Sequence, residues 1–300
     1  MSTVRLGINP LTWTNDDMPS LGGDTPLETC LFEGREAGFS GFELGNKFPR
    51  DPDVLGPILQ RHDLSLVSGW YSSELLTRSA EEEIEAIKPH LHLLKSLGAK
   101  AMVFCEVSHC VHGRRDVPLS HSPSMNEAQW QTFISRLNQV ADYCLEQGVQ
   151  IAYHHHLGTV VETEAEVDRL MAEAAPSVGL LLDSGHLVGA GGDPIAVQQK
   201  HAERIVHVHC KDIRREVLED ARNRDLSFLD GVLNGMFTVP GDGFIDYITL
   251  FKGLRDSGYE GWVVVEAEQD PAVAHPLTYA RLGCDNLKRF CAEAGLTVTE

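Results

Sequence analysis

Residues 148–186 read GVQIAYHHHLGTVVETEAEVDRLMAEAAPSVGLLLDSGH, and this stretch decides the fold. It continues from its glycine into a short apolar run at 150–153, a helical pattern at 164–174 and a second apolar run at 178–182. Apolar runs of this length are typical of strands that are buried on both faces, as in a parallel sheet. Gly148 stands between a helical pattern and a strand, where the left-handed end of a helix favours glycine.

The same unit recurs along almost the whole chain. Short apolar runs predict strands at 4–8, 41–44, 64–67, 101–105, 150–153, 178–182, 205–208 and 262–265. Helical patterns follow them at 25–37, 54–61, 80–97, 126–147, 164–174, 194–202, 245–257 and 277–294. Gly38, Gly98 and Gly258 stand where Gly148 stands, just before a strand. About eight units in 300 residues fit a closed (β/α)8 TIM barrel of the α/β class better than the alternative, an open doubly wound sheet.

The totals narrow the class of protein. No linker, low-complexity stretch or charge block divides the chain, so we expect one domain over 1–300, with the irregular stretch 211–244 lying over one mouth of the barrel. The formal net charge of -19 argues against nucleic acid and against an anionic membrane surface, and suits neutral or cationic small molecules. Seven scattered cysteines without a CxxC pair, and a start without a signal-peptide pattern, predict a cytoplasmic protein with reduced thiols. No apolar run approaches the ~20 residues of a membrane span.

Polar residues end the predicted strands, and in a barrel of this kind those ends build the active site. The eight residues are Asn9, Glu43, Ser68, Glu106, His154, Asp183, His209 and Glu266. The last four end successive strands and should meet side by side at one rim. Two imidazoles and two carboxylates at the same level suit Mn²⁺, Co²⁺ or Zn²⁺, so we predict a metal site. The alternative is a set of unrelated helix caps and core histidines.

Further candidates lie close to these four in the sequence. Strand alternation places His156 on the face of His154, and His155 on the opposite face among the helices. His186 follows Asp183 by three residues and is expected to contact the metal or the substrate, with a helix or loop cap as the alternative.

Alternation along the seventh strand places His207, His209 and Lys211 on one face. His207 lies deeper, as a partner of a ligand or as a core histidine. Lys211 points over the site and is expected to act as a base with a lowered pKa, or else to pair with Glu266 or Asp183.

Aromatic residues near the strand ends could line the substrate pocket. Trp13, Trp70 and Tyr71 follow strands one and three, and either form an apolar wall for a ring-shaped substrate or simply pack in the core. No phosphate-binding glycine motif appears, so nucleotide binding has no support.

Three stretches resemble the signature of the sugar phosphate isomerase/epimerase superfamily, the xylose isomerase-like barrels. They are residues 183–186 (DSGH), 207–212 (HVHCKD) and 265–266 (VE). Within that group the chain is most similar to the myo-inosose-2 dehydratase family of inositol catabolism. This closer resemblance is carried by residues 7–10 (GINP), 41–47 (GFELGNK), 67–71 (VSGWY), 153–156 (YHHH), 237–243 (FTVPGDG) and 265–271 (VEAEQDP).

The resemblance implies a metal-dependent dehydratase that removes water from 2-keto-myo-inositol through a metal-stabilised enolate, giving a trihydroxycyclohexane-1,2-dione. It implies Mn²⁺ or Co²⁺, with Zn²⁺ or Mg²⁺ as alternatives, and it is the sole reason to consider glutathione or a homo-oligomer. Many superfamily members have a glutamate ligand where this chain has His154, so His156 or a water is the alternative fourth ligand.

Roles at the site follow as expectations from this chemistry. The expected metal ligands are His154, Asp183, His209 and Glu266. The candidate acids, bases and catalytic contacts are Lys211, His156, His186 and Glu106. The candidate substrate contacts are Glu43, Asn46, Trp13, Trp70 and Asn9. The rival functions are an isomerase or epimerase of keto sugars or cyclitols with the same metal site, and a non-catalytic cyclitol-binding protein.

Overall fold

The computed structural model describes residues 2–299. Its strands are β1 (Thr3–Ile8), β2 (Gly41–Phe42), β3 (Ser65–Leu66), β4 (Trp70–Ser73), β5 (Ala101–Glu106), β6 (Gln150–His154), β7 (Val178–Asp183), β8 (Ile205–Cys210), β9 (Asp212–Ile213), β10 (Phe237–Thr238), β11 (Gly261–Val265) and β12 (Thr297–Thr299). Its helices are α1 (Leu27–Ala37), α2 (Pro52–Arg61), α3 (Ala80–Ser96), α4 (Glu127–Glu146), α5 (Glu164–Glu173), α6 (Ser184–Gly189), α7 (Pro194–Lys200), α8 (Arg215–Asn223), α9 (Phe228–Leu233), α10 (Tyr247–Asp256) and α11 (Pro276–Ala294). No helix among the described residues is long and apolar enough to cross a membrane.

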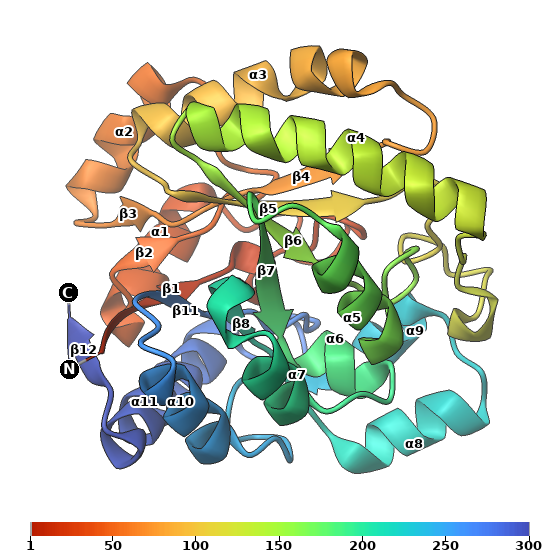
Figure 1. Cartoon of the computed structure of the whole chain (residues 1–300). Coiled ribbons are helices and arrows are strands. Elements are labelled where there is room, and N and C mark those ends of the chain that lie inside the picture. Colours follow the sequence, from red (N-terminus) through yellow and green to blue (C-terminus); the bar gives the residue numbers. More distant parts are fainter. Residues whose placement is uncertain (1, 300) are drawn as a thin grey trace.

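The strands form the predicted parallel barrel (Figure 1). Their hydrogen-bonded order is β3-β2-β1-β11-β8-β7-β6-β5-β4, and β12 adds to β1. The two ends of this path, β3 and β4, are separated in the chain by residues 67–69 alone, so they are the two halves of one strand that changes neighbours. Eight strands therefore circle the axis, as predicted, and the wall between β3 and β4 is continuous through the chain itself.

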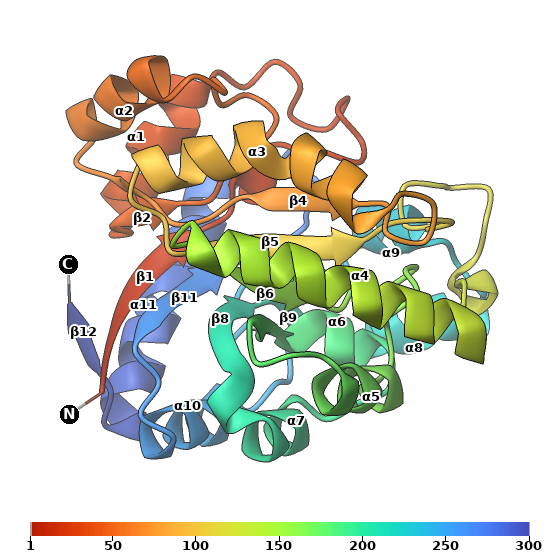
Figure 2. The same ribbon diagram turned by 45° about the horizontal axis from the view of Figure 1, so that its top comes forward.

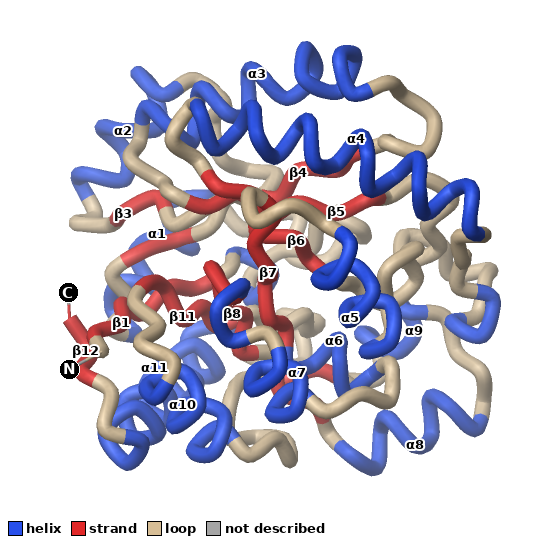
Figure 3. The backbone as a smooth tube through the Cα atoms, viewed as in Figure 1, coloured by secondary structure: helices blue, strands red, loops and turns tan. Residues whose placement is uncertain are grey.

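Helices cover the outside of the barrel (Figures 2 and 3). Three of them begin with a capping box, in which the side chains of Ser79, Asn126 and Thr163 accept from the backbone N–H groups at the start of α3, α4 and α5. Gly38, Gly98, Gly148 and Gly258 have φ angles between 73° and 106°, which confirms their predicted role at helix ends.

Two stretches differ from the prediction. Trp70 and Tyr71 do not merely follow the third strand, because they begin β4, which pairs with β5. The stretch 211–244 is not irregular: it holds the antiparallel pair β9–β10 and the helices α8 and α9. Its apolar side chains form a separate small core around Phe228 and Phe237, near the carboxyl ends of the strands.

Candidate metal centre and active site

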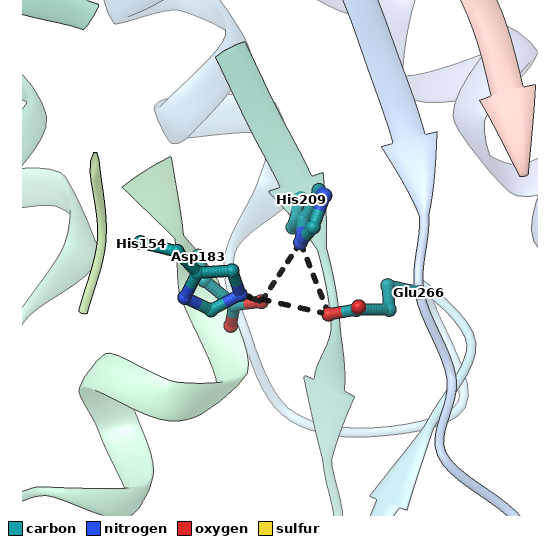
Figure 4. Close-up of side chains that lie close together, drawn as sticks. All are labelled: His154, Asp183, His209 and Glu266. Atoms are coloured by element: carbon teal, nitrogen blue, oxygen red, sulfur yellow. Dashed lines mark ion pairs between the residues drawn. The ribbon is translucent and has the colours of Figure 1, made fainter. Parts of the chain in front are cut away.

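Four side chains meet at the carboxyl ends of neighbouring strands (Figure 4). His154 ends β6, Asp183 ends β7, His209 lies near the end of β8 and Glu266 directly follows β11. The Nε2 atom of His154 lies 3.7 Å from Asp183 Oδ2 and 3.9 Å from Glu266 Oε2. The Nδ1 atom of His209 lies 3.5 Å from Asp183 Oδ2 and 3.0 Å from Glu266 Oε2. One ligand atom from each residue thus faces a common point.

Each of the four side chains is fixed through its outer atom. His154 Nδ1–H donates to the carbonyl of His155 at 2.6 Å, and His209 Nε2–H donates to Glu43 at 3.1 Å. Asp183 Oδ1 accepts from the backbone N–H of His186 at 2.7 Å. These hydrogen bonds set the tautomer of each imidazole and direct the second nitrogen inward, as metal-binding histidines require.

Glu266 is held in the same way, since its Oε1 accepts from the side chain of Asn9 at 3.2 Å. The four inward atoms, His154 Nε2, Asp183 Oδ2, His209 Nδ1 and Glu266 Oε2, are buried and make no hydrogen bond. Buried polar atoms are normally satisfied, and an unpaired one costs roughly 1–3 kcal/mol. Four orphaned ligand atoms around one point therefore fit a divalent cation.

The electrostatics of the group point the same way. Burial opposes a charge on His209, but the carboxylates of Glu266 and Glu43 outweigh burial and hold the pKa of His209 well above its ordinary value. The carboxylates around His209 therefore favour positive charge at this position. A divalent cation would supply that charge, and metal ligands bind in their deprotonated form.

Glu43 supports the ligands and is not free to bind substrate hydroxyls, which corrects our expectation. Its carboxylate accepts from Asn9 Nδ2 at 2.8 Å, from Ser68 Oγ at 2.5 Å, and from the imidazoles of His207 at 2.8 Å and His209 at 3.1 Å. Burial alone would raise the pKa of Glu43, but His209 and His207 outweigh it and lower that pKa. His207 therefore contacts Glu43, and Glu43 in turn contacts the proposed ligand His209.

A second cluster lies beside the first. Lys211 Nζ contacts His186 Nε2 at 2.8 Å, Glu268 Oε1 at 2.5 Å and Glu266 Oε2 at 3.0 Å, and its side chain is fully buried. The ring of His156 stacks on that of His186 with centroids 3.8 Å apart. Burial opposes a charge on Lys211, yet Glu266 and Glu268 raise its pKa. The expectation of a lowered lysine pKa is wrong, and the alternative, a pair with Glu266, is present.

A pocket opens beside both clusters. Its lining residues are Asn9, Leu11, Asp16, Asp17, Leu44, Trp70, His112, His156, Glu266 and Glu268. The ring of Trp70 lies 5.4 Å from that of His154 and 5.6 Å from that of His156. The structure thus brings Trp70, Asn9 and His156 together at this pocket. The side-chain amide of Asn9 also donates hydrogen bonds to Glu43 and Glu266.

Three expected site residues lie elsewhere. Glu106 is fully buried, and its carboxylate accepts from Ser73 Oγ, Leu75 N and Ser108 N, so it fixes the loops after β4 and β5. Trp13 is 1% exposed and donates from its indole to Glu33, and it forms no pocket wall. Asn46 is exposed and contacts Asp16 through its backbone N–H rather than its side chain.

Sequence reasoning missed several pocket residues. Glu268 follows Glu266 by two, and this spacing placed His156 with His154 and Lys211 with His209, so the same rule could have found it. Asp17 and His112 come from two loops, and their Oδ1 and Nε2 atoms lie 3.6 Å apart at the pocket. Residues 95 positions apart on loops carry no periodic signal that would have predicted this contact.

Comparison with known proteins agrees with this fold. Residues 33–290 match the family described as "Xylose isomerase-like TIM barrel", and the chain belongs to that family. It is 50% identical over 299 residues to "Rhizopine catabolism protein MocC" of Rhizobium meliloti, covering 100% of this chain and 92% of that protein. It is 47% identical over 290 residues to "Inosose dehydratase" of Geobacillus thermodenitrificans (strain NG80-2), covering 96% of this chain and 97% of that protein.

Solved structures share the fold at low identity. The zinc-binding structure of IOLI protein superposes with a TM-score of 0.67 at 20% identity, covering 97% of this chain and 98% of the other. L-ribulose 3-epimerase superposes with a TM-score of 0.68 at 16% identity, covering 97% and 96%. At such identities the likeness speaks for the barrel alone.

Proposed function

We propose that this chain is a hydro-lyase that removes water from 2-keto-myo-inositol, an inosose, and leaves a trihydroxycyclohexane-1,2-dione. Near-full-length relatives named inosose dehydratase, at 46–47% identity, support the substrate and the reaction. The observation that carries the chemistry is the ring of four buried, unsatisfied ligand atoms on His154, Asp183, His209 and Glu266.

These four side chains would hold one divalent cation, for which we propose Mn²⁺ or Co²⁺. Two imidazoles with two carboxylates suit both ions, which accept mixed nitrogen and oxygen ligands. When bound, such an ion supplies Lewis acidity toward the ketone oxygen of the substrate, which makes the neighbouring C–H hydrogen more acidic. His154 rather than His156 is the ligand that we propose, because its Nε2 atom faces Asp183 and Glu266.

His156 is the base that we propose for removing the hydrogen next to the ketone. Its Nδ1–H donates to the carbonyl of Leu157 at 2.7 Å, which leaves the lone pair on Nε2. His156 lines the pocket together with Glu266, and we propose that this lone pair faces the substrate. Lys211 does not suit this role, since its ammonium hydrogen-bonds to His186 and Glu268 and forms an ion pair with Glu266.

Glu268 is the acid that we propose for protonating the departing hydroxyl. It lines the same pocket as His156 and comes from the loop that also supplies Glu266. Burial raises the pKa of Glu268 to about 7 against the opposing influence of Lys211, so at neutral pH a share of its carboxyl groups keeps a proton to donate. An acid and a base that reach one pocket from two different elements are what an elimination of water requires.

The pocket suits a polyol without negative charge. Leu11, Leu44 and Trp70 offer apolar surface to a carbon ring, while Asp16 and Asp17 offer acceptors to hydroxyl groups. The lining holds four carboxylates and no lysine or arginine, so it disfavours a phosphate or carboxylate on the substrate. The same carboxylates disfavour glutathione, an anionic tripeptide, and we leave it out of the proposed cofactors. A related cyclitol is the second candidate substrate, because of the relative named for rhizopine catabolism.

The cellular setting that we propose is the cytoplasm. All seven cysteines are free thiols, and six of them are buried, which suits a reducing compartment. The net charge of -19 supports a small-molecule partner over nucleic acid or an anionic membrane.

Metal removal and product analysis test the proposal together. Chelation with EDTA should abolish formation of the dione from 2-keto-myo-inositol, and Mn²⁺ or Co²⁺ should restore it. Full turnover by protein whose metal content has been shown to be negligible would rule out the metal-dependent mechanism. Proton NMR in D₂O separates the rivals: a deuterated isomer without dione indicates an epimerase, and binding without any product indicates a cyclitol-binding protein.

A further inference from the structure

Lys211 lies in a buried network of hydrogen bonds and ion pairs. Its Nζ lies 2.5 Å from Glu268 Oε1, 2.8 Å from His186 Nε2 and 3.0 Å from Glu266 Oε2. The first two contacts are hydrogen bonds, and the third is an ion pair with the Glu266 carboxylate. The side chain is 0% exposed, so no water competes for these contacts. The ammonium is thus surrounded by protein groups on all sides and has no contact with solvent.

Two of the groups that contact this ammonium, His186 and Glu268, belong together with His156 to a set of residues that are metal ligands by type. His156, His186 and Glu268 each offer one ligand atom, and the three atoms lie within 4.8 Å of one another. Two imidazoles and one carboxylate are a set that binds divalent transition metals. All three residues are at least nine-tenths buried.

The tautomers of the two imidazoles suit a cation at this place. His156 donates from Nδ1 to the Leu157 carbonyl at 2.7 Å and keeps its Nε2 free. His186 faces N–H groups on both sides, from Lys211 at 2.8 Å and from the backbone N–H of Leu157 at 3.3 Å. A neutral imidazole accepts on one nitrogen only, and the shorter contact assigns the lone pair to Nε2, toward the cation.

We propose that His156, His186 and Glu268 form a second cation site next to the first, and that the ammonium of Lys211 occupies it in place of a second metal ion. Glu266 links the two sites, since its Oε2 faces both the first ligand group and Lys211 Nζ. The centre then holds one exchangeable cation and one cation that is part of the chain. Removing the lysine side chain should leave room and ligands for a second divalent ion.

Metal counting on Lys211→Ala tests this inference with Mn²⁺ as the probe. Purified wild-type protein and K211A are saturated with Mn²⁺ and dialysed, and bound metal is measured by mass spectrometry. We expect one equivalent per chain in the wild type and two in K211A. We also expect K211A to show an exchange-coupled Mn²⁺ pair by electron paramagnetic resonance, because a shared Glu266 would bring the ions close together.

Two controls separate the cause. Lys211→Met removes the charge but fills the space with a thioether, and it should stay at one equivalent. K211A with Glu268→Gln vacates the space but removes the carboxylate ligand, and it should also return to one. Should K211A prove too unstable to purify, Lys211→Ser poses the same question with a small polar side chain, and its thermal stability should rise with Mn²⁺ in two saturable steps.

A folded K211A or K211S that binds one equivalent, with no coupled spectrum, overturns the second site. The proposed metal enzyme fails separately, because wild-type protein that binds no Mn²⁺ would contradict the first site whatever the variants do.

Discussion

At the scale of single residues, the proposed metal site depends on the hydrogen bonds that orient its ligands as well as on the ligands themselves. Glu43 is bonded to His209 and His207, and it has no other role in the pocket. Such supporting carboxylates orient a ligating imidazole and raise its basicity. The metal affinity of the site should therefore depend on a residue that does not touch the metal.

Glu43→Gln tests that dependence. The amide keeps the size of the side chain but removes its charge, so we expect Mn²⁺ or Co²⁺ to bind about 10- to 100-fold more weakly. Competition against a chelating dye measures the affinity, and circular dichroism checks the fold. Glu106→Gln is the matched control, since it changes a buried carboxylate that only fixes loops. Equal affinities in wild type and E43Q would contradict the supporting role.

Glu268→Gln tests the proposed acid. Glutamine keeps an acceptor for Lys211 but cannot release a proton, so kcat should fall by about 10²- to 10⁴-fold while one metal ion stays bound. Steady-state kinetics on 2-keto-myo-inositol, together with metal analysis, measures both effects. A wild-type kcat would exclude Glu268 as the acid, and loss of the metal would give it a structural role at the first site instead.

The meeting of the four proposed ligands could be predicted from the sequence because strand ends in a barrel meet at one rim. That rule alone groups His154, Asp183, His209 and Glu266, and the structure brings one ligand-type atom of each together. The partners of Glu43 and Trp13 did not follow, since a hydrogen bond depends on which residue of another element comes opposite. Glu43 and His207 are 164 residues apart in the chain, and no local pattern links them.

At the scale of elements, a helix can approach the barrel closely only where its contact residue is small. Gly34 lies on α1 against β2, and a Cβ there would come within 2.3 Å of the Phe42 ring. Gly34→Ala should therefore lower the free energy of unfolding by about 1–3 kcal/mol through overpacking. Urea denaturation measures the change.

Gly56→Ala is the matched control for that experiment. Gly56 also lies within a helix, α2, but its nearest neighbour would be the end of the Leu97 side chain at 3.1 Å, which can move. Alanine is favoured over glycine in helices by up to about 1 kcal/mol, so the stability of G56A should be unchanged or raised. A G34A variant as stable as G56A would show that α1 can shift outward at no cost.

The predicted elements were right where periodicity is strong and wrong where it is interrupted. Residues 68–69 break the apolar run of the third strand, so the sequence pattern ends that strand at residue 67 and does not predict β4. Helix α8 was missed because it is mostly charged and buries only Leu218 and Ala221 along its length. A helix with so narrow an apolar face resembles a solvated loop in sequence.

At the scale of the whole molecule, the first and last described strands, β1 and β12, lie side by side (Figure 1). β12 pairs in parallel with the first residues of β1, from Thr3 to Arg5, while β2 pairs only with Gly7 and Ile8. The final strand therefore covers an edge of β1 that no other described strand covers, at the end opposite to the metal ligands.

Deletion of residues 297–300 tests this closure. It exposes the polar backbone groups of β1, and we expect the free energy of unfolding to fall by about 1–2 kcal/mol. Turnover and metal content at 25 °C should stay the same, because the deleted strand lies far from the ligand ring. Thermal unfolding followed by circular dichroism measures the loss. A truncated chain as stable as the full one would show that β12 only rests on the barrel.

The strand that changes neighbours has a consequence for how the barrel opens. β3 pairs with β2, and β4 pairs with β5, so each half of this strand is paired with a neighbouring strand on one side only. At this place the barrel is closed by the peptide chain of residues 67–69 instead of by hydrogen bonds between strands. Trp70 begins β4 at this place, and its ring lies 5.4 Å from the ring of His154. Local opening of the barrel should therefore begin at this place. Backbone amides near Gly69 should exchange hydrogen for deuterium faster than those of β7. We expect a ring-shaped substrate to enter from this side.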